Sequence, residues 1–226
     1  MTVATELDLD SLSIRQVNAA LQGAEEGAFR VLHAGGAHAL ACGLNATLDV
    51  TIDGHAGYYC AGMNKHASVT VMGNAGTGCA ENIMSGQVRV QRDVSQSLAA
   101  SGHGGLVVVE GSASARAGIS MKGVDIVVGG DVGHMSGFMA QTGRLVVLGD
   151  SGSDLGDSIY EAQIYVRGAV ASLGADCVEK PMAEEHTASL AELLARAGFD
   201  ADATSFRRFG SARKLYHFSI DNMEDY

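Results

Sequence analysis

Histidine and cysteine, the side chains that most often carry catalysis or bind metals, are scattered here without a recognisable spacing. None of the eight histidines forms an H-x-H or H-x-x-x-H pair, and the four cysteines form no CxxC pair. Zinc and iron–sulfur motifs usually place at least two ligands this close together. We expect buried structural thiols in a reducing compartment, with metal or disulfide use, or a zinc site assembled from distant segments, as the alternatives. The residues are His33, His38, His55, His66, His103, His134, His186, His217, Cys42, Cys60, Cys79 and Cys177.

Motifs for nucleophilic catalysis and phosphate binding are also missing. No G-x-S-x-G nucleophile elbow occurs, and the string SARK at Ser211–Lys214 is expected to be a basic turn. The glycine-rich strings GNAGTG and GSASARAG lack the G-x-x-x-x-G-K-[ST] pattern of a P-loop and the strand–helix context of a dinucleotide loop. The sequence therefore contains no recognisable set of residues that could form a complete active site in this chain alone.

The composition narrows the class of protein. The chain has 226 residues, 30 glycines, one proline, no tryptophan and a formal charge of −11. Small and β-branched residues must therefore fill the core, and the charge argues against nucleic acid or anionic membranes as partners. No apolar run approaches the roughly 20 residues of a membrane span, and the acidic N-terminus lacks a signal-peptide pattern. We expect a cytoplasmic protein.

A repeat of 19 residues organises most of the chain. Strand-like phrases such as VTVMGNAG and IVVGGDVG return in phase over roughly residues 48–172. We call each repeat a coil and the residue after its strand the marker. The seven markers are Gly54, Gly73, Arg92, Gly111, Gly130, Gly149 and Gly168.

Two aliphatic columns explain the repeat. The residues four and two places before each marker are Val, Ile or Leu in every coil, whereas the residue between them varies. Residues two apart on a strand face the same way, so each coil sends two aliphatic side chains inward. A lone strand of this kind buries nothing, and 19 residues are too few for a strand–helix unit. The pattern predicts a single-stranded parallel β-helix, an all-β fold of about seven coils, with short helices at both ends.

Small residues are expected at the corners of the coils, where larger side chains would obstruct tight turns or the approach of a neighbouring backbone. The structural corner glycines are Gly54, Gly57, Gly73, Gly76, Gly111, Gly130, Gly133, Gly149, Gly152 and Gly168. Cys60 and Cys79 share the column six places after the marker, which favours stacked inward-facing thiols.

Both ends of the chain depart from the repeat. Residues 10–23 predict a helix capped by Asp10 or Ser11 and stopped by Gly23, which would close one end of the β-helix. Residues 182–199 predict a second amphipathic helix. We accordingly divide the chain into an N-terminal cap with an irregular first coil (1–47), the β-helix (48–178) and a C-terminal helix with an aromatic and basic arm (179–226).

Two features point to a covering partner. The column three places before the marker turns apolar in the last four coils, which suggests that this half of one face is covered by the C-terminal helix or by another subunit. The arm is rich in aromatic and arginine residues, which are typical anchors of interfaces, although it could instead fold back on its own solenoid. The candidate interface residues are Val108, Val127, Val146, Leu148, Tyr165, Phe206, Arg207, Arg208, Phe209, Tyr216 and Phe218.

The strings GYYCAGM, AENIMSG, GISMKGVDIVVGGDVGHMSGFMAQTGRLVVLGD and SLGADCVEK resemble the GXGXG domain at the C-terminus of the glutamate synthase large subunit. The free-standing GlxC-like subunits, equivalent to the GXGXG subunit of N-methylglutamate synthase, are more similar still, over almost the whole chain. A subunit of formylmethanofuran dehydrogenase that uses similar coils is a more distant relative. The resemblance implies a right-handed β-helix that is not itself catalytic.

The resemblance also implies partners. An amidotransferase-like subunit and an FMN-binding subunit would carry the activity, and this chain alone would bind no cofactor and no metal. The implied complex makes N-methylglutamate and ammonia from glutamate and methylamine. The alternatives are a scaffold subunit of a formylmethanofuran-type formyltransferase/hydrolase complex and an independent left-handed β-helix acyltransferase. The acyltransferase would have 18-residue coils and usually a catalytic histidine.

We assign no catalytic residues. Two polar and methionine-containing turns, Asn82–Gly86 and Gly133–Met139, are the places where this chain would face the FMN-binding partner. Asn82 and His134 are the residues to test there.

Overall fold

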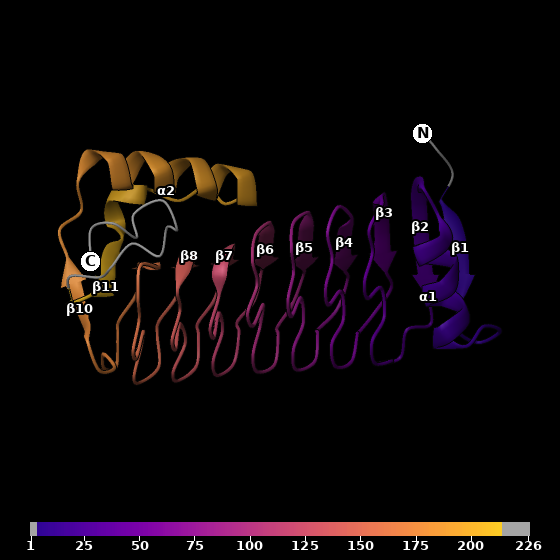
Figure 1. Cartoon of the computed structure of the whole chain (residues 1–226), viewed down its shortest axis with the longest axis horizontal. Helices are drawn as coiled ribbons and strands as arrows, with labels where there is room; N and C mark the ends of the chain where they lie inside the picture. Colours follow the sequence, from indigo (N-terminus) through magenta and orange to yellow (C-terminus); the bar gives the residue numbers. More distant parts are fainter. Residues whose placement is uncertain (1–3, 214–226) are drawn as a thin grey trace, which may run out of the picture.

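The computed structural model describes residues 4–213 and consists of a stack of coils with a helix at each end (Figure 1). Eleven strands form one sheet in the order β1-β2-β3-β4-β5-β6-β7-β8-β9-β11-β10. The strands are β1 (Thr5–Asp8), β2 (Glu26–Leu32), β3 (Thr47–Ile52), β4 (Ser68–Val71), β5 (Gln87–Val90), β6 (Leu106–Val109), β7 (Lys122–Val128), β8 (Thr142–Val147), β9 (Gln163–Val166), β10 (Cys177–Lys180) and β11 (Arg207–Ser211). The helices are α1 (Ile14–Gly23), α2 (Glu184–Ala197) and a 3₁₀ turn (Ala203–Ser205).

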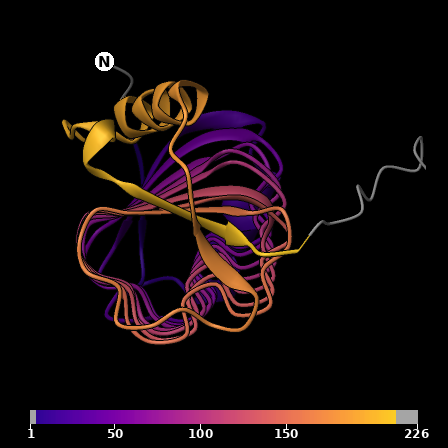
Figure 2. The same ribbon diagram turned by 90° about the vertical axis from the view of Figure 1, so that its left-hand side faces the viewer.

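The coils stack in register, as the repeat predicts. Strands β1 to β9 are parallel, and Val50 pairs with Val69, which in turn pairs with Val88. A second line of bridges runs from Ala56 through Ala75 and beyond on the next side of each coil. Viewed along the axis, the coils nearly superimpose (Figure 2). The parallel β-solenoid predicted from the sequence is confirmed.

The aliphatic columns form the core. All fourteen of these side chains are fully buried, and so is the column that holds Cys60 and Cys79. The fourteen are Val50, Val69, Val88, Val107, Ile126, Leu145, Ile164, Ile52, Val71, Val90, Val109, Val128, Val147 and Val166. Their burial confirms the inward direction predicted from the two-residue alternation.

Backbone conformation adds a reason for small residues at one corner. The residue seven places after the marker has φ between 50° and 71° in six successive coils. Left-handed backbone costs a side-chain-bearing residue about 1 kcal/mol and costs glycine almost nothing. Alanine occupies this column in the first three coils and glycine in the next three, namely Ala61, Ala80, Ala99, Gly118, Gly137 and Gly156.

The N-terminal end is closed by α1, but the helix begins later than predicted. Ser13 is the N-cap: its hydroxyl accepts from the backbone N–H of Gln16, and the Gln16 side chain accepts from the Ser13 N–H. The predicted caps are wrong because Asp10 and Ser11 belong to a turn after β1, in which the Ser11 N–H donates to the Asp8 carbonyl. Val17 and Leu21 face inward and cover the end of the core.

The C-terminal end is closed by a hairpin-like addition to the sheet. β11 runs antiparallel to β9, and β10 runs antiparallel to β11, so that both strands cross the end of the stack (Figure 2). Between them the chain leaves the end and forms α2, which lies along the outside of the last coils (Figure 1). One sheet therefore contains strands from all three ranges into which we divided the sequence, 1–47, 48–178 and 179–226.

Candidate functional site

The apolar stripe on the last four coils is covered by the chain itself. Val108, Val127, Val146 and Tyr165 are completely buried and form one cluster with the apolar side of α2. The other members of this cluster are Leu106, Leu148, Leu190, Leu193, Leu194, Ala197, Ala203 and Phe206. Of the two covers left open by the sequence, the structure places the chain's own helix there. These side chains are therefore not a surface that a partner can reach.

Two arginines tie α2 to the solenoid. Arg144 donates two hydrogen bonds of 2.7 and 2.6 Å to the carboxylate of Asp125 and a third of 2.7 Å to the Ser189 hydroxyl. The hydrogen bonds to Asp125 raise the pKa of Arg144 further above its already high value. At the other end of the helix, Arg89 donates to the Ala197 carbonyl at 2.7 Å, where the helix dipole favours a cation.

The described part of the aromatic arm folds back onto the solenoid. Phe206 and Phe209 are buried, and Phe209 joins the main core. Arg207 lies over the Phe209 ring and pairs with Glu179, whereas Arg208 donates to the Pro181 carbonyl. Pairing with β9 places Phe209 in the main core, whereas Phe206 packs in the cluster under α2. Of the two roles that the sequence leaves open for the arm, these residues show the fold back onto the solenoid. Tyr216 and Phe218 lie outside the described residues.

A ladder of polar side chains follows the marker along one corner. Each side chain accepts a hydrogen bond from the backbone N–H one coil further on, at 2.7–3.1 Å. The acceptors are His55, Asn74, Asp93, Ser112, Asp131 and Asp150. The ladder satisfies corner N–H groups that the sheet does not reach.

The ladder accounts for several glycine markers. A Cβ on Gly149 would overlap the Asp131 carboxylate and the backbone of Gly130, and a Cβ on Gly168 would overlap the Asp150 carboxylate. The glycines three places after the marker lie equally close to the preceding coil: a Cβ on Gly76 would come within 2.7 Å of the Gly57 carbonyl carbon. Close approach between coils therefore requires glycine at these corners.

The two turns singled out in the sequence do not converge. Asn82 lies nine places after its marker with φ 54°, and His134 lies four places after its own, three coils further on. The structure therefore does not bring Asn82 and His134 into one site. The turns do present exposed methionines: Met84 is 42% exposed and Met139 is 41% exposed.

The cysteines are thiols inside the core. All four are free and buried. Burial raises the pKa of Cys79 to about 12 and that of Cys177 to about 11, and it also raises the pKa of Cys60 and Cys42. A thiol held in its protonated form is a poor nucleophile and metal ligand, which favours a structural role.

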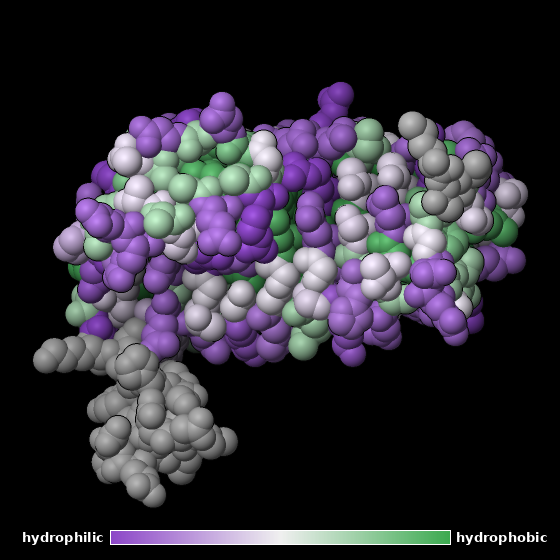
Figure 3. Space-filling model, turned by 90° about the horizontal axis from the view of Figure 1, so that it is seen from above, coloured by the Kyte–Doolittle hydropathy of each residue, from purple (hydrophilic) through white to green (hydrophobic). Residues whose placement is uncertain are grey.

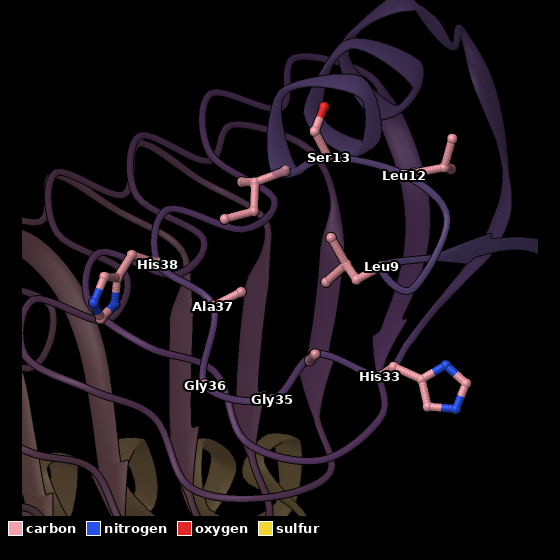
Figure 4. A pocket seen from close by; sticks show the side chains of 10 residues that line it. Leu9, Leu12, Ser13, His33, Gly35, Gly36, Ala37 and His38 are labelled. Atoms are coloured by element: carbon pink, nitrogen blue, oxygen red, sulfur yellow. The ribbon is translucent and has the colours of Figure 1, made fainter.

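A cavity of about 650 Å³ opens beside α1 (Figure 4). Leu9, Leu12, Ile14 and Ala37 make it largely apolar. His33 lies on its rim, and its ring points away from the cavity (Figure 4).

The His33 ring meets two carboxylates, one from Asp8 at the end of β1 and one from Asp10 in the turn that follows. Its Nδ1 lies 2.7 Å from Asp8 Oδ1 and 3.3 Å from Asp10 Oδ2. The hydrogen bond between them raises the pKa of His33 and lowers that of Asp8. Sequence spacing did not reveal this group, because its members are brought together only by the pairing of β1 with β2. Within residues 4–213 it is the group of histidine and carboxylate side chains whose donor atoms lie close enough to share an ion.

No helix within residues 4–213 is both long and apolar enough to cross a membrane. No family model matches the chain. The chain is 59% identical over 73 residues to Protein GlxC of Rhizobium meliloti (strain 1021), a match that covers 32% of each protein. The match spans about a third of that relative's length and supports a GlxC-like relation for this chain.

Proposed function

We propose that this chain is a structural subunit of a glutamate-synthase-like complex. In this role it holds an amidotransferase-like subunit and an FMN-binding subunit in fixed positions relative to each other. The observation that carries the proposal is the 59% identity to Protein GlxC over a third of the chain. The strings that resemble the glutamate synthase GXGXG domain, such as AENIMSG and SLGADCVEK, point the same way. The more specific proposal is a complex of the N-methylglutamate synthase type, with methylamine as the incoming nitrogen.

The geometry of the chain is suited to such a role. Eleven hydrogen-bonded strands make a rod that is stiff along its axis, because each coil is tied to the next by strand pairing and by the polar ladder. Both ends of the core are covered from within the chain, by α1 and by β11 with β10. Seen from above, hydrophilic side chains are interspersed with small apolar patches (Figure 3). A closed rod of this kind presents fixed positions to partners.

The turns with exposed methionines are the contact that we propose for a partner. Met63 and Met139 stand in the same column, nine places after the marker and four coils apart, and Met84 lies two places further along its own coil. Flexible thioether side chains adapt to apolar partner surfaces and are frequent at interfaces. The FMN-binding subunit is the partner that we assign to this side of the rod.

The first experiment is purification of the native protein from its source, followed by mass spectrometry of the accompanying chains and an absorption spectrum. We expect an amidotransferase-like chain, an FMN-binding chain and a flavin spectrum. Turnover with methylamine or with ammonia then identifies the substrate. A protein that purifies alone and colourless contradicts the proposal, and copurification with formyltransferase and amidohydrolase chains assigns it to the formylmethanofuran type.

Variants then test the docking side. We expect Met84→Glu together with Met139→Glu to reduce the yield of intact complex at least tenfold, because charge replaces apolar contact. Met72→Glu is the matched control, since Met72 is 40% exposed but stands in the column before the marker. Asn82→Ala and His134→Ala test the two polar residues of the same turns. If all of these variants assemble and turn over like the wild type, the partner binds elsewhere.

A further inference from the structure

We propose that Asp8, Asp10 and His33 form a binding site for a divalent transition-metal ion of the Zn²⁺ class at the N-terminal end of the rod. The proposal rests on the geometry of these three side chains and is independent of the proposed function. The site brings together the end of β1 (Asp8), the turn that follows it (Asp10) and His33, the residue that follows β2.

The donor atoms already have spacings close to those of a metal site. Zn²⁺ binds nitrogen and oxygen at about 2.0–2.2 Å, and angles of 90–110° then put neighbouring donors about 3.0–3.5 Å apart. His33 Nδ1 and Asp10 Oδ2 are 3.3 Å apart, and His33 Nδ1 and Asp8 Oδ1 are 2.7 Å apart. One donor atom from each of the three residues lies within 4.8 Å of the other two. The spacing of His33 Nδ1 and Asp10 Oδ2 already suits an ion, whereas Asp8 Oδ1 must move away from Nδ1, because an ion replaces the proton of the hydrogen bond between them.

Backbone contacts position the three residues, and one proposed ligand atom takes part, because the Asp10 N–H donates to Asp8 Oδ1 at 2.9 Å. Asp8 pairs with Leu32 across the parallel strands β1 and β2, which puts His33 beside it. The Leu9 N–H donates to the Leu32 carbonyl at 3.2 Å, and the Ser11 and Leu12 N–H groups donate to the Asp8 carbonyl at 3.1 and 2.8 Å. This turn carries Asp10 back toward His33. The site is therefore preorganised, and the side chains of Asp10 and His33 can be changed without removing these backbone contacts.

The chemistry of the set favours a transition metal over Mg²⁺ or Ca²⁺. Two carboxylates and one imidazole supply two negative charges and a nitrogen ligand, whereas Mg²⁺ and Ca²⁺ prefer oxygen alone. The side chains of Asp8, Asp10 and His33 are 38%, 76% and 59% exposed, so water can complete the coordination and the ion can enter from solvent. Three protein ligands with one position left for water match the ligand number of open zinc sites.

The test is calorimetric titration of the metal-free full chain with ZnCl₂ at neutral pH in a buffer that does not bind metals. We expect one Zn²⁺ per chain and a higher melting temperature on binding, with no comparable effect of MgCl₂. His33→Ala and Asp10→Asn should each weaken Zn²⁺ binding at least about tenfold. His103→Ala, which removes another exposed histidine, is the matched control and should bind within twofold of the wild type.

The outcomes separate a metal site from a plain ion pair. Absence of saturable Zn²⁺ binding in the wild type shows that His33 serves only as an ionic partner of the two aspartates, and this overturns the proposal. Equal binding by wild type and both variants places the ion elsewhere, and equal affinity for Mg²⁺ indicates a nonspecific acidic surface. Asp10→Asn keeps the assay interpretable if His33→Ala fails to fold, because the Asp10 side chain is the most exposed of the three.

Discussion

The polar residue that follows the marker in one coil contacts the marker of the next coil. Asp131 accepts the N–H of Asp150, and its carboxylate occupies the space in which a side chain on Gly149 would stand. A polar acceptor in one coil thus favours glycine at the next marker, with one exception in the ladder: Arg92 is the marker that follows the acceptor Asn74. The chain uses Asn74, Ser112 and aspartates interchangeably in the ladder, because each offers an oxygen at the same reach.

We expect Gly149→Ala to lower the free energy of unfolding by about 1–3 kcal/mol, since the added methyl group overpacks a gap already filled by Asp131 and Gly130. Thermal or denaturant unfolding measures the change. Gly23→Ala is the control: no atom lies within 4 Å of the added carbon, and alanine favours the helix that Gly23 ends. Equal destabilisation by the two substitutions would show that the ladder does not favour glycine at this marker.

The buried thiols predict a pH dependence. The pKa of Cys79 is about 12 in the folded chain, whereas an unfolded thiol titrates near 8.5. Above about pH 9 the unfolded chain loses a proton that the folded chain retains, so stability falls as pH rises, by up to about 1.4 kcal/mol per pH unit for this group. We expect the four thiols of the folded protein to react slowly with a thiol reagent at pH 8 and rapidly in denaturant. Fast labelling of the folded chain would contradict the assigned burial.

The elements show which contacts the sequence could reveal. The repeat identifies β3 to β9, because their fourteen aliphatic residues recur every 19 positions and are all buried. β1, β10 and β11 lie outside the repeat: Thr5 pairs with Phe29 across 24 residues, and Arg207 pairs with Val166 in the antiparallel direction. The Asp8–Asp10–His33 group depends on β1, so it could not be predicted before that strand was seen. The sequence indicates a cover over the apolar stripe and leaves open whether it is the C-terminal helix or another subunit, and the structure shows α2 there.

The helix α2 is held mainly by its apolar side. We expect Leu193→Ala to cost about 2–4 kcal/mol, because Leu193 is fully buried against the stripe and truncation leaves a cavity. Proteolysis between residues 181 and 200 should accelerate in parallel. Glu192→Ala, an exposed neighbour on the same helix, should change stability by less than about 0.5 kcal/mol. If Leu193→Ala leaves both measurements unchanged, α2 is only loosely attached in solution.

At the scale of the whole molecule, the ends decide whether the stack remains a single rod. Every inner strand finds two neighbours, whereas β1 and β10 are edge strands of the sheet. An open end of a parallel stack exposes core residues and a template for further strands, which favours aggregation. At the first end α1 covers the core with Val17 and Leu21.

We therefore expect Leu21→Asp to destabilise the protein by about 4 kcal/mol or more and to cause association detectable by light scattering, because it buries a charge beneath the cap. Ala20→Asp on the exposed side of α1 is the control and should remain monodisperse at the same concentration. Equal behaviour of the two variants would mean that α1 does not seal the end.

The 19-residue repeat from β3 to β9 also fixes the spacing of positions along the rod. Each coil adds one strand spacing of about 4.8 Å, and along the ladder each side chain reaches the backbone N–H that follows 19 residues later. Along the ladder, the distance between two points on the rod therefore changes by one 19-residue coil at a time, whereas beyond it the last coil is one residue shorter, since Leu155 pairs with Leu173. Insertion of one complete 19-residue coil between β5 and β6 would lengthen the rod by one strand spacing and keep the side-chain columns aligned. Insertion of only a few residues would shift every later residue out of its column.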